Sequence, residues 1–142
     1  MSLVNPLDTL LENIKNSLAA KLPGRVVTRS LPLDPVNEPE ATLRAGLLCV
    51  LSDSGGRFAN YRGREGQLGH LLVPVLGFVR VDDDAGGLAV ERAELALLDD
   101  VLGWCANPGA VSPVQTAPQE FRQSHQLEQP YGWFVLTLDV RT

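Results

Sequence analysis

The chain has 142 residues, of which 44% are hydrophobic, and this is enough for one domain with a buried core. It carries 17 acidic and 12 basic residues, a net charge of -5. Because proteins that hold duplex nucleic acid usually present a basic surface, the charge argues against specific nucleic-acid binding and favours protein partners.

The sequence contains no clear export or membrane signal. The N-terminal segment lacks a basic region followed by a continuous apolar run, which predicts a cytoplasmic start. The uncharged stretch 66–79 is shorter than the roughly 20 residues that a spanning helix needs. Cys49 and Cys105 lie in apolar runs, which predicts buried thiols; a redox or metal role is the alternative.

The first predicted element is an amphipathic helix over 6–21. Asn5 can cap it, Pro6 suits its first turn, and leucine and isoleucine recur at intervals of three and four residues. A short strand over 25–29 follows, and then a proline-bearing loop over 30–41. A second strand is predicted over 42–52.

The segment 57–66 has the composition of a contact loop. It contains five basic or aromatic residues, namely Arg57, Phe58, Tyr61, Arg62 and Arg64. Arginine and aromatic side chains are enriched in protein interfaces, and they also stack on single-stranded nucleic acid. Docking to a protein and a solvated hairpin loop are the two main interpretations, and the acidic chain disfavours nucleic acid.

The third predicted strand, 67–81, is apolar on both of its faces. Pro74 has no N–H to donate to a ladder, which predicts a sheet edge, a bulge or a break at that position. Asp82, Asp83 and Asp84 form the turn into a helix over 88–106. In that helix Leu95 is placed on the main apolar stripe.

The last third of the chain contains a long loop and a closing strand. The loop covers 108–130 and holds a weak strand over 121–126, and the alternation over 131–141 predicts the last strand. The element order predicts a single α+β domain over 1–142. It has a mainly antiparallel sheet of about four to five strands with two helices packed on one face.

Two helices can cover only one face of such a sheet, while strand 67–81 is apolar on both. Either a folded-back loop or another subunit covers the second face. No nucleophile elbow or phosphate loop is present, and His70 and His125 lack metal-ligand spacing. The contiguous acids 82–84 do not match a calcium loop. No catalytic residue, cofactor or metal is predicted. The strand that is apolar on both faces, the presence of only two predicted helices and the contact loop 57–66 lead us to expect assembly and not catalysis.

The layout resembles the tail terminators, or tail-completion proteins, of long-tailed bacteriophages of the Mu-like and lambda-like groups. The resemblance lies in the first helix ending in Leu22-Pro23-Gly24, the hydrophobic strand 71–81, the helix 89–106 and the closing strand 134–140. It implies a structural protein that forms a ring, commonly a hexamer, in the host cytoplasm. The ring caps the tail tube, ends tail elongation and joins the head or neck in the virion.

By position, the resemblance makes the loop 57–66 a candidate contact with the tail-tube protein or a neighbouring copy. It makes Asp82, Asp83 and Asp84 candidate acids of a lumen through which DNA passes without specific binding. Two alternatives remain: a head-to-tail connector or neck protein, and a small-molecule-binding or enzymatic α+β domain. A pocket lined by Tyr131 or Trp133 in a strictly monomeric protein would favour the second.

Overall fold

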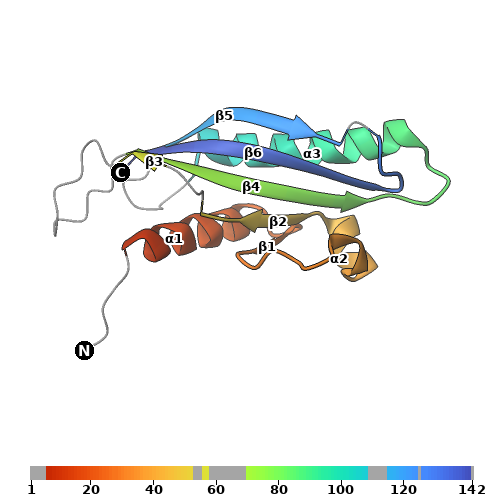
Figure 1. The fold of residues 1–142 in the computed structure, drawn as a ribbon, viewed down its shortest axis with the longest axis horizontal. Coiled ribbons are helices and arrows are strands. Elements are labelled where there is room, and N and C mark those ends of the chain that lie inside the picture. The colour runs from red at the N-terminus through yellow and green to blue at the C-terminus, as the bar shows by residue number, and fades with distance from the viewer. Residues whose placement is uncertain (1–5, 53–55, 58–69, 109–114, 125, 142) are drawn as a thin grey trace.

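A computed structural model describes residues 6–52, 56–57, 70–108, 115–124 and 126–141. The protein is an α+β domain built on one mostly antiparallel sheet (Figure 1). The strands lie in the order β1 (Val26–Thr28), β2 (Leu47–Val50), β4 (His70–Arg80), β6 (Tyr131–Arg141) and β5 (Gln115–Gln123). The short β3 (Gly56–Arg57) pairs with β4, and only β1 and β2 run parallel. The predicted fold class is confirmed.

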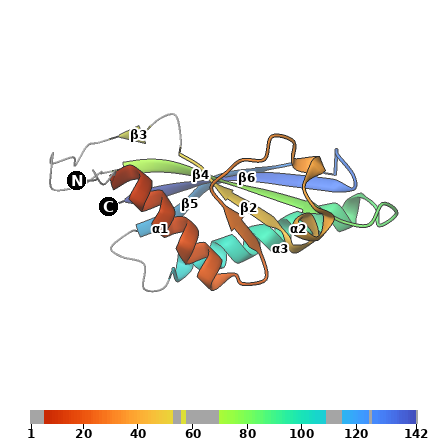
Figure 2. The same ribbon diagram turned by 90° about the horizontal axis from the view of Figure 1, so that it is seen from below.

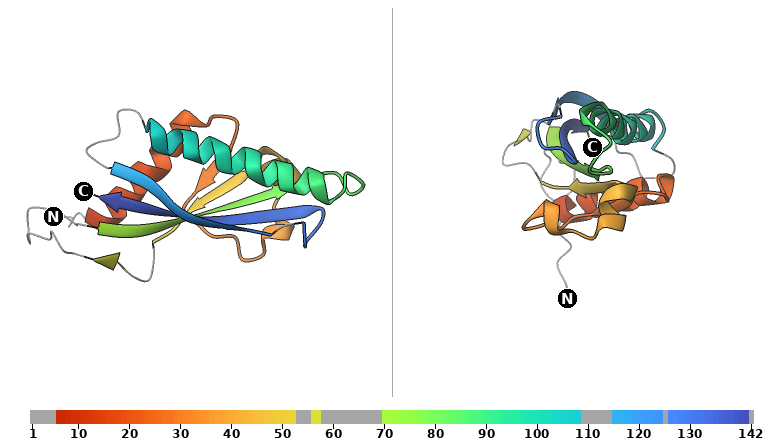
Figure 3. Two further views of the ribbon diagram at one scale, coloured as in Figure 1. Left: turned by 90° about the horizontal axis from the view of Figure 1, so that it is seen from above. Right: turned by 90° about the vertical axis from the view of Figure 1, so that its right-hand side faces the viewer.

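The two long helices pack on one face of this sheet. α1 (Pro6–Lys21) contacts β1 and β2, and α3 (Gly87–Ala106) contacts β4, β5 and β6 (Figures 2 and 3). Their apolar sides meet alternate residues of the strands, and on β6 these are Phe134, Leu136, Leu138 and Val140. The predicted bounds of α1 and β6 and the alternation of β6 are confirmed.

The segment between β1 and β2 is more ordered than predicted. It contains a 3-10 turn, η1 (Pro35–Asn37), and a short helix, α2 (Glu40–Ala45), so the prediction of strand from residue 42 is wrong. Glu40 and Arg44 form a helical ion pair at 2.7 Å, and Gly46 ends the helix with a φ of 87°. These local preferences override the strand pattern, which holds only from Leu47 onward.

Pro74 lies on a central strand, so the predicted edge, bulge or break there is wrong. β4 is paired on both sides, and its register with β6 runs unbroken through Pro74 and Thr137. The carbonyl of Pro74 accepts from the N–H of Leu51, one residue beyond the end of β2. The missing N–H therefore faces the point where β2 stops, and the ladder with β6 loses no hydrogen bond.

Two other predictions about elements are corrected. The weak strand over 121–126 is the end of β5, which begins at Gln115 and has an irregular register between Pro118 and Glu120. On α3 the buried stripe runs through Val90, Glu94, Leu97, Val101 and Trp104, whereas Leu95 is 43% exposed. The buried side of the helix is therefore rotated relative to the predicted stripe. Apolar residues occupy a wide sector of this helix, so the sequence did not fix which side of that sector faces the sheet.

A buried hydrogen-bond chain joins α1 to the end of α3. Trp104 donates from Nε1 to Oγ of Ser17 at 2.8 Å, and that hydroxyl donates to the carbonyl of Pro108 at 2.8 Å. Both Trp104 and Ser17 are buried. These hydrogen bonds give the buried indole N–H an acceptor at the point where the two helices meet.

Replacing Ser17 with Ala is expected to lower the free energy of unfolding by about 1–3 kcal/mol, because the buried indole N–H loses its acceptor. Urea unfolding monitored by tryptophan fluorescence measures the change. Ser30→Ala, at an exposed position, is the matched control and should leave the unfolding free energy nearly unchanged. Equal effects of the two substitutions would contradict a role for this hydrogen bond.

Candidate functional site

The second face of the sheet, which points away from α1 and α3, is the candidate site and is called the open face below. On it Phe78 lies opposite Trp133, and Leu76 lies opposite Val135. These side chains are only partly buried, although they lie on central strands. Leu47, on the neighbouring β2, is 3% exposed on the same face. The open face is therefore covered near β2 and partly accessible along β4 and β6.

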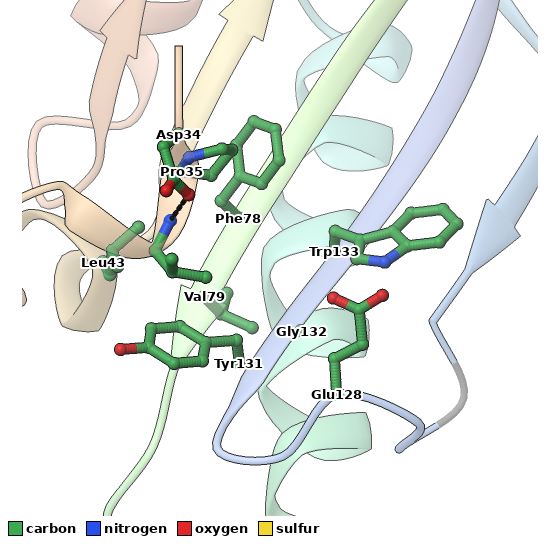
Figure 4. Close-up of a pocket in the computed structure, with 10 residues that line it drawn as sticks. Asp34, Pro35, Leu43, Phe78, Val79, Glu128, Tyr131, Gly132 and Trp133 are labelled. Carbon is green, nitrogen blue, oxygen red and sulfur yellow. Dashed lines mark hydrogen bonds between the residues drawn. The ribbon is translucent and has the colours of Figure 1, made fainter. Parts of the chain in front are cut away.

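A hollow of about 210 Å³ lies where the η1–α2 segment meets β4 and β6 (Figure 4). Its aromatic lining comes from Phe78, Tyr131 and Trp133, and Leu43 of α2 contributes an aliphatic wall. Leu43 is 1% exposed, so it fixes α2 to the sheet. The folded-back segment 30–45 thus covers one end of the open face and creates a concave site beside it.

Two carboxylates, of Asp34 and Glu128, stand at this hollow. Asp34 caps η1: it accepts from the N–H of Val36 at 3.3 Å and from Nδ2 of Asn37 at 2.9 Å. Glu128 extends its carboxylate toward the ring of Trp133 (Figure 4). Among the residues that the structure describes, neither acid forms an ion pair. The hollow therefore combines an aromatic floor with uncompensated negative charge.

Three exposed aliphatic side chains belong to the two segments that supply the acids of the hollow. Val36 is 43% exposed, Leu127 is 85% exposed, and Leu33 is fully exposed. Leu33 and Leu127 each precede one of the two acids in sequence. Exposed apolar side chains on segments that line a concave site are a feature of binding surfaces.

An ion-pair network joins α2 to the turn between β4 and α3. Arg44 contacts Glu40 at 2.7 Å and Asp82 at 2.6 Å, and Arg80 contacts Asp83 at 3.0 Å. Hydrogen bonding to Glu40 raises the pKa of Arg44, and hydrogen bonding to Asp83 raises the pKa of Arg80. Two of the three predicted lumen acids therefore have partners in their own chain, and the charge of the turn is partly compensated.

Arg80 also lies over the ring of Tyr131, with 5.4 Å from its guanidinium carbon to the ring centroid. This is a cation–π arrangement at the margin of the hollow. It holds the ring of Tyr131 in place and occupies one of its faces. The rings of Phe78 and Trp133 remain as the aromatic surface of the hollow.

The predicted contact loop 57–66 lies almost entirely outside the described residues. Arg57 is placed in β3, where it pairs with His70 at the start of β4. Phe58, Tyr61, Arg62 and Arg64 fall among the residues that the structure does not describe. The same is true of His125. The loop assignment remains a prediction.

Glu94 is a polar site that the sequence reasoning missed. It is fully buried on α3, where it accepts from the hydroxyl of Ser124 and from Nε2 of Gln123 at 3.4 Å. Gly132 makes room for it, because a Cβ at that glycine would lie 2.6 Å from Oε1 of Glu94. The signal in the sequence was an acid on the stripe Val90, Glu94, Leu97 and Val101, where an apolar residue is expected.

The two cysteines are free and buried, as predicted. Burial raises the pKa of Cys49, and it raises the pKa of Cys105 from 9.0 to about 11. Both side chains are therefore neutral thiols near neutral pH and are poor nucleophiles.

Between pH 9 and 11 the unfolded chain loses the Cys105 proton while the folded chain retains it, so stability is expected to fall as pH rises through this window. The loss is on the order of 2 kcal/mol. Urea unfolding of the wild type and of Cys105→Ala at both ends of the window measures it, since the variant lacks this part of the pH dependence. Identical slopes would contradict the raised pKa.

Within the described ranges no cluster of three or more His, Cys, Asp or Glu side chains could hold a metal ion. In the same part of the chain no helix is both long enough and apolar enough to span a membrane. The open face and its hollow together form a partly accessible apolar surface that carries two carboxylates. Searches with this chain find no matching protein-family model and no matching curated protein.

Proposed function

We propose that the chain is a structural tail protein of a phage or prophage, which assembles as a ring on the tail tube, ends tail elongation and offers a surface for head joining. The observation that carries the proposal is the open face. Central strands hold Phe78, Trp133 and Val135 only partly buried, and a domain that worked alone would bury such side chains more fully. Assembly with other chains covers this area.

The distribution of the elements supports assembly as well. Both long helices lie on one face. Within the described residues the other face is covered only in part, by the short η1–α2 segment and the turn that holds Glu128. The outer strand β5 is exposed from Ala117 to Arg122, and Glu120 and Arg122 place charge along that edge. Charged edges disfavour strand addition, so contacts between copies are expected through side-chain surfaces.

Growth of the tail tube tests this function. Tail-tube protein of the same phage is polymerised with increasing amounts of this chain, and light scattering follows elongation. A terminator is expected to stop elongation at far less than one copy per tube subunit and to pellet with the tubes at a fixed number per tube. Saturation along the whole tube, or no effect on its length, would contradict the proposal.

Two site assignments belong to this proposal. Alanine at Arg57, Arg62 and Arg64 together is expected to weaken tube binding or ring formation if the loop is a contact. Asp82, Asp83 and Asp84 are expected to line the lumen. Finding these aspartates on the outer rim of an assembled ring would remove that assignment and leave ring formation itself untouched.

A second candidate function rests on the hollow at Tyr131 and Trp133. Such concave sites with a few polar groups also bind small molecules, in binding domains and in enzymes. This function requires a protein that stays monomeric at high concentration with and without tube protein. The same elongation experiment separates the two, because a small-molecule-binding domain has no effect on tube growth. A head-to-tail connector would bind a head adaptor and not the tube.

A further inference from the structure

We infer that the hollow beside Trp133 is the receiving half of a contact between neighbouring copies, and that its occupant is the exposed strip of α3 formed by Leu88, Arg92 and Leu95 of the next copy. This inference rests on the proposed function and names the contact that would build the ring. Features of both surfaces support it.

The hollow has the side chains expected of a site that binds a positively charged side chain flanked by apolar ones. Its floor is aromatic, through Phe78 and Trp133, and its two carboxylates, of Asp34 and Glu128, have no ion pair among the described residues. A cation held over aromatic faces beside carboxylates gains both a cation–π and a Coulomb interaction in a partly desolvated place. Leu127, next in sequence to Glu128, is 85% exposed and adds an apolar side chain to the segment that supplies this acid.

The strip on α3 supplies the matching chemistry. Leu88 is 51% exposed and Leu95 is 43% exposed, and Arg92 lies exposed between them. Spacings of four and three residues place the three side chains on one side of the helix. Within the described chain Arg92 forms no ion pair, whereas Arg25, Arg44 and Arg80 all do. A free cation flanked by two exposed leucines is therefore available on this surface.

The sizes also agree. A cavity of about 150 Å³ holds a benzene molecule, so a hollow of about 210 Å³ has room for one guanidinium and the end of its stem. The two leucines stand about 10 Å apart along the helix axis, at 1.5 Å per residue. In the contact they would lie against exposed apolar side chains of the segments that form the hollow, such as Val36 and Leu127.

The two surfaces lie on opposite sides of the sheet. The helix α3 packs on the helix-covered face (Figure 3), and the residues that line the hollow lie on the open face. A contact between two different surfaces of the same chain is head-to-tail, and such contacts close into rings when the rotation between copies permits. The pairing therefore accounts for ring growth from one repeated contact.

A charge exchange tests the contact. In Arg92→Glu, a negative charge on α3 meets the two acids of the hollow. In the double variant Asp34→Asn with Glu128→Lys, a positive charge in the hollow meets Arg92. Asn at 34 retains the capping oxygen of η1. Each variant alone is expected to weaken self-association at least about tenfold in sedimentation equilibrium. An equimolar mixture of the two is expected to restore association, because both kinds of mixed contact pair opposite charges.

The control is Lys21→Glu, which makes the same charge change at the exposed end of α1 and should leave association unchanged. Circular dichroism of each variant verifies folding. The indole N–H signals of the two tryptophans report the contact independently: the Trp133 signal should shift with protein concentration, and that of the buried Trp104 should not.

Three results would overturn the inference. They are association of Arg92→Glu equal to that of the wild type, failure of the mixture to associate, and a wild type that remains monomeric at millimolar concentration with and without tube protein. Rings that depend on Arg92 but do not end tube growth would instead remove the proposed tail function and leave the contact. Tube capping that survives Arg92→Glu would remove the contact and leave the function.

Discussion

Glu94→Ala is expected to lower the free energy of unfolding by about 3–5 kcal/mol. The side chain is fully buried and holds Ser124 and Gln123, at the end of β5, against α3. Its removal leaves buried polar groups without a partner and opens a cavity. A domain of this size is stable by only about 5–15 kcal/mol, so urea unfolding should show a marked shift of the midpoint.

Glu94→Gln is the matched control, because it keeps the shape and an oxygen that accepts from the Ser124 hydroxyl. It should lose clearly less stability than the alanine variant. Hydrogen exchange of the β5–β6 hairpin locates the effect, since Glu94→Ala should speed exchange there before it speeds exchange in α1. A loss that is equal for both variants, or spread evenly over the chain, would contradict the anchoring role.

Gly77→Ala is expected to lower the free energy of unfolding by about 3 kcal/mol through overpacking. Gly77 lies on the helix-covered face of β4, opposite Phe134, and the ring of Phe134 fills the place where a side chain would stand. An added Cβ would lie 2.8 Å from Cδ2 of that ring and closer still to its outer carbons. Phe134 is 1% exposed, so its ring has no space into which it could turn.

A second substitution tests this mechanism. Phe134→Leu removes the ring, so the pair Gly77→Ala with Phe134→Leu should be more stable than the sum of the two single losses predicts. Thermal unfolding of the four proteins gives the coupling. Gly103→Ala serves as control, because a Cβ at Gly103 meets no atom within 4 Å. Simple additivity of the two losses would contradict the steric account.

The elements that were predicted correctly are those whose pattern is local and regular. The spacing of leucines gives α1, and strict alternation gives β6 with its buried Phe134 and Leu136. β4 was recognised as apolar on both faces, and the structure shows why: one face meets α3, and the other forms the partly covered open face. Period and polarity alone carry this information.

The elements that were missed depend on contacts distant in sequence. The helix α2 follows an apolar–polar pattern compatible with a strand until Gly46, and only the packing of Leu43 on the sheet gives it a place. Pro74 looked unfit for a central strand, because the sequence does not reveal that β2 ends opposite it. The depth of burial of Glu94 likewise follows from Gly132 on another element.

The candidate site divides in the same way. Tyr131 and Trp133 were named from the sequence only as the lining that would favour the alternative, a small-molecule-binding domain, and both line the hollow. The acids Asp34 and Glu128 were not named from the sequence. They reach the hollow from two loops that are far apart in sequence, one before β2 and one between β5 and β6. A site assembled from loop residues on either side of a strand pair leaves no periodic signal.

Electron microscopy of tail tubes grown with this protein tests the central claim most directly. Tubes formed in its presence should be short and should carry a closed ring of this chain at one tip, while tubes formed with Arg92→Glu should lack the ring. Tubes of normal length with bare tips in the presence of wild-type protein would contradict the account.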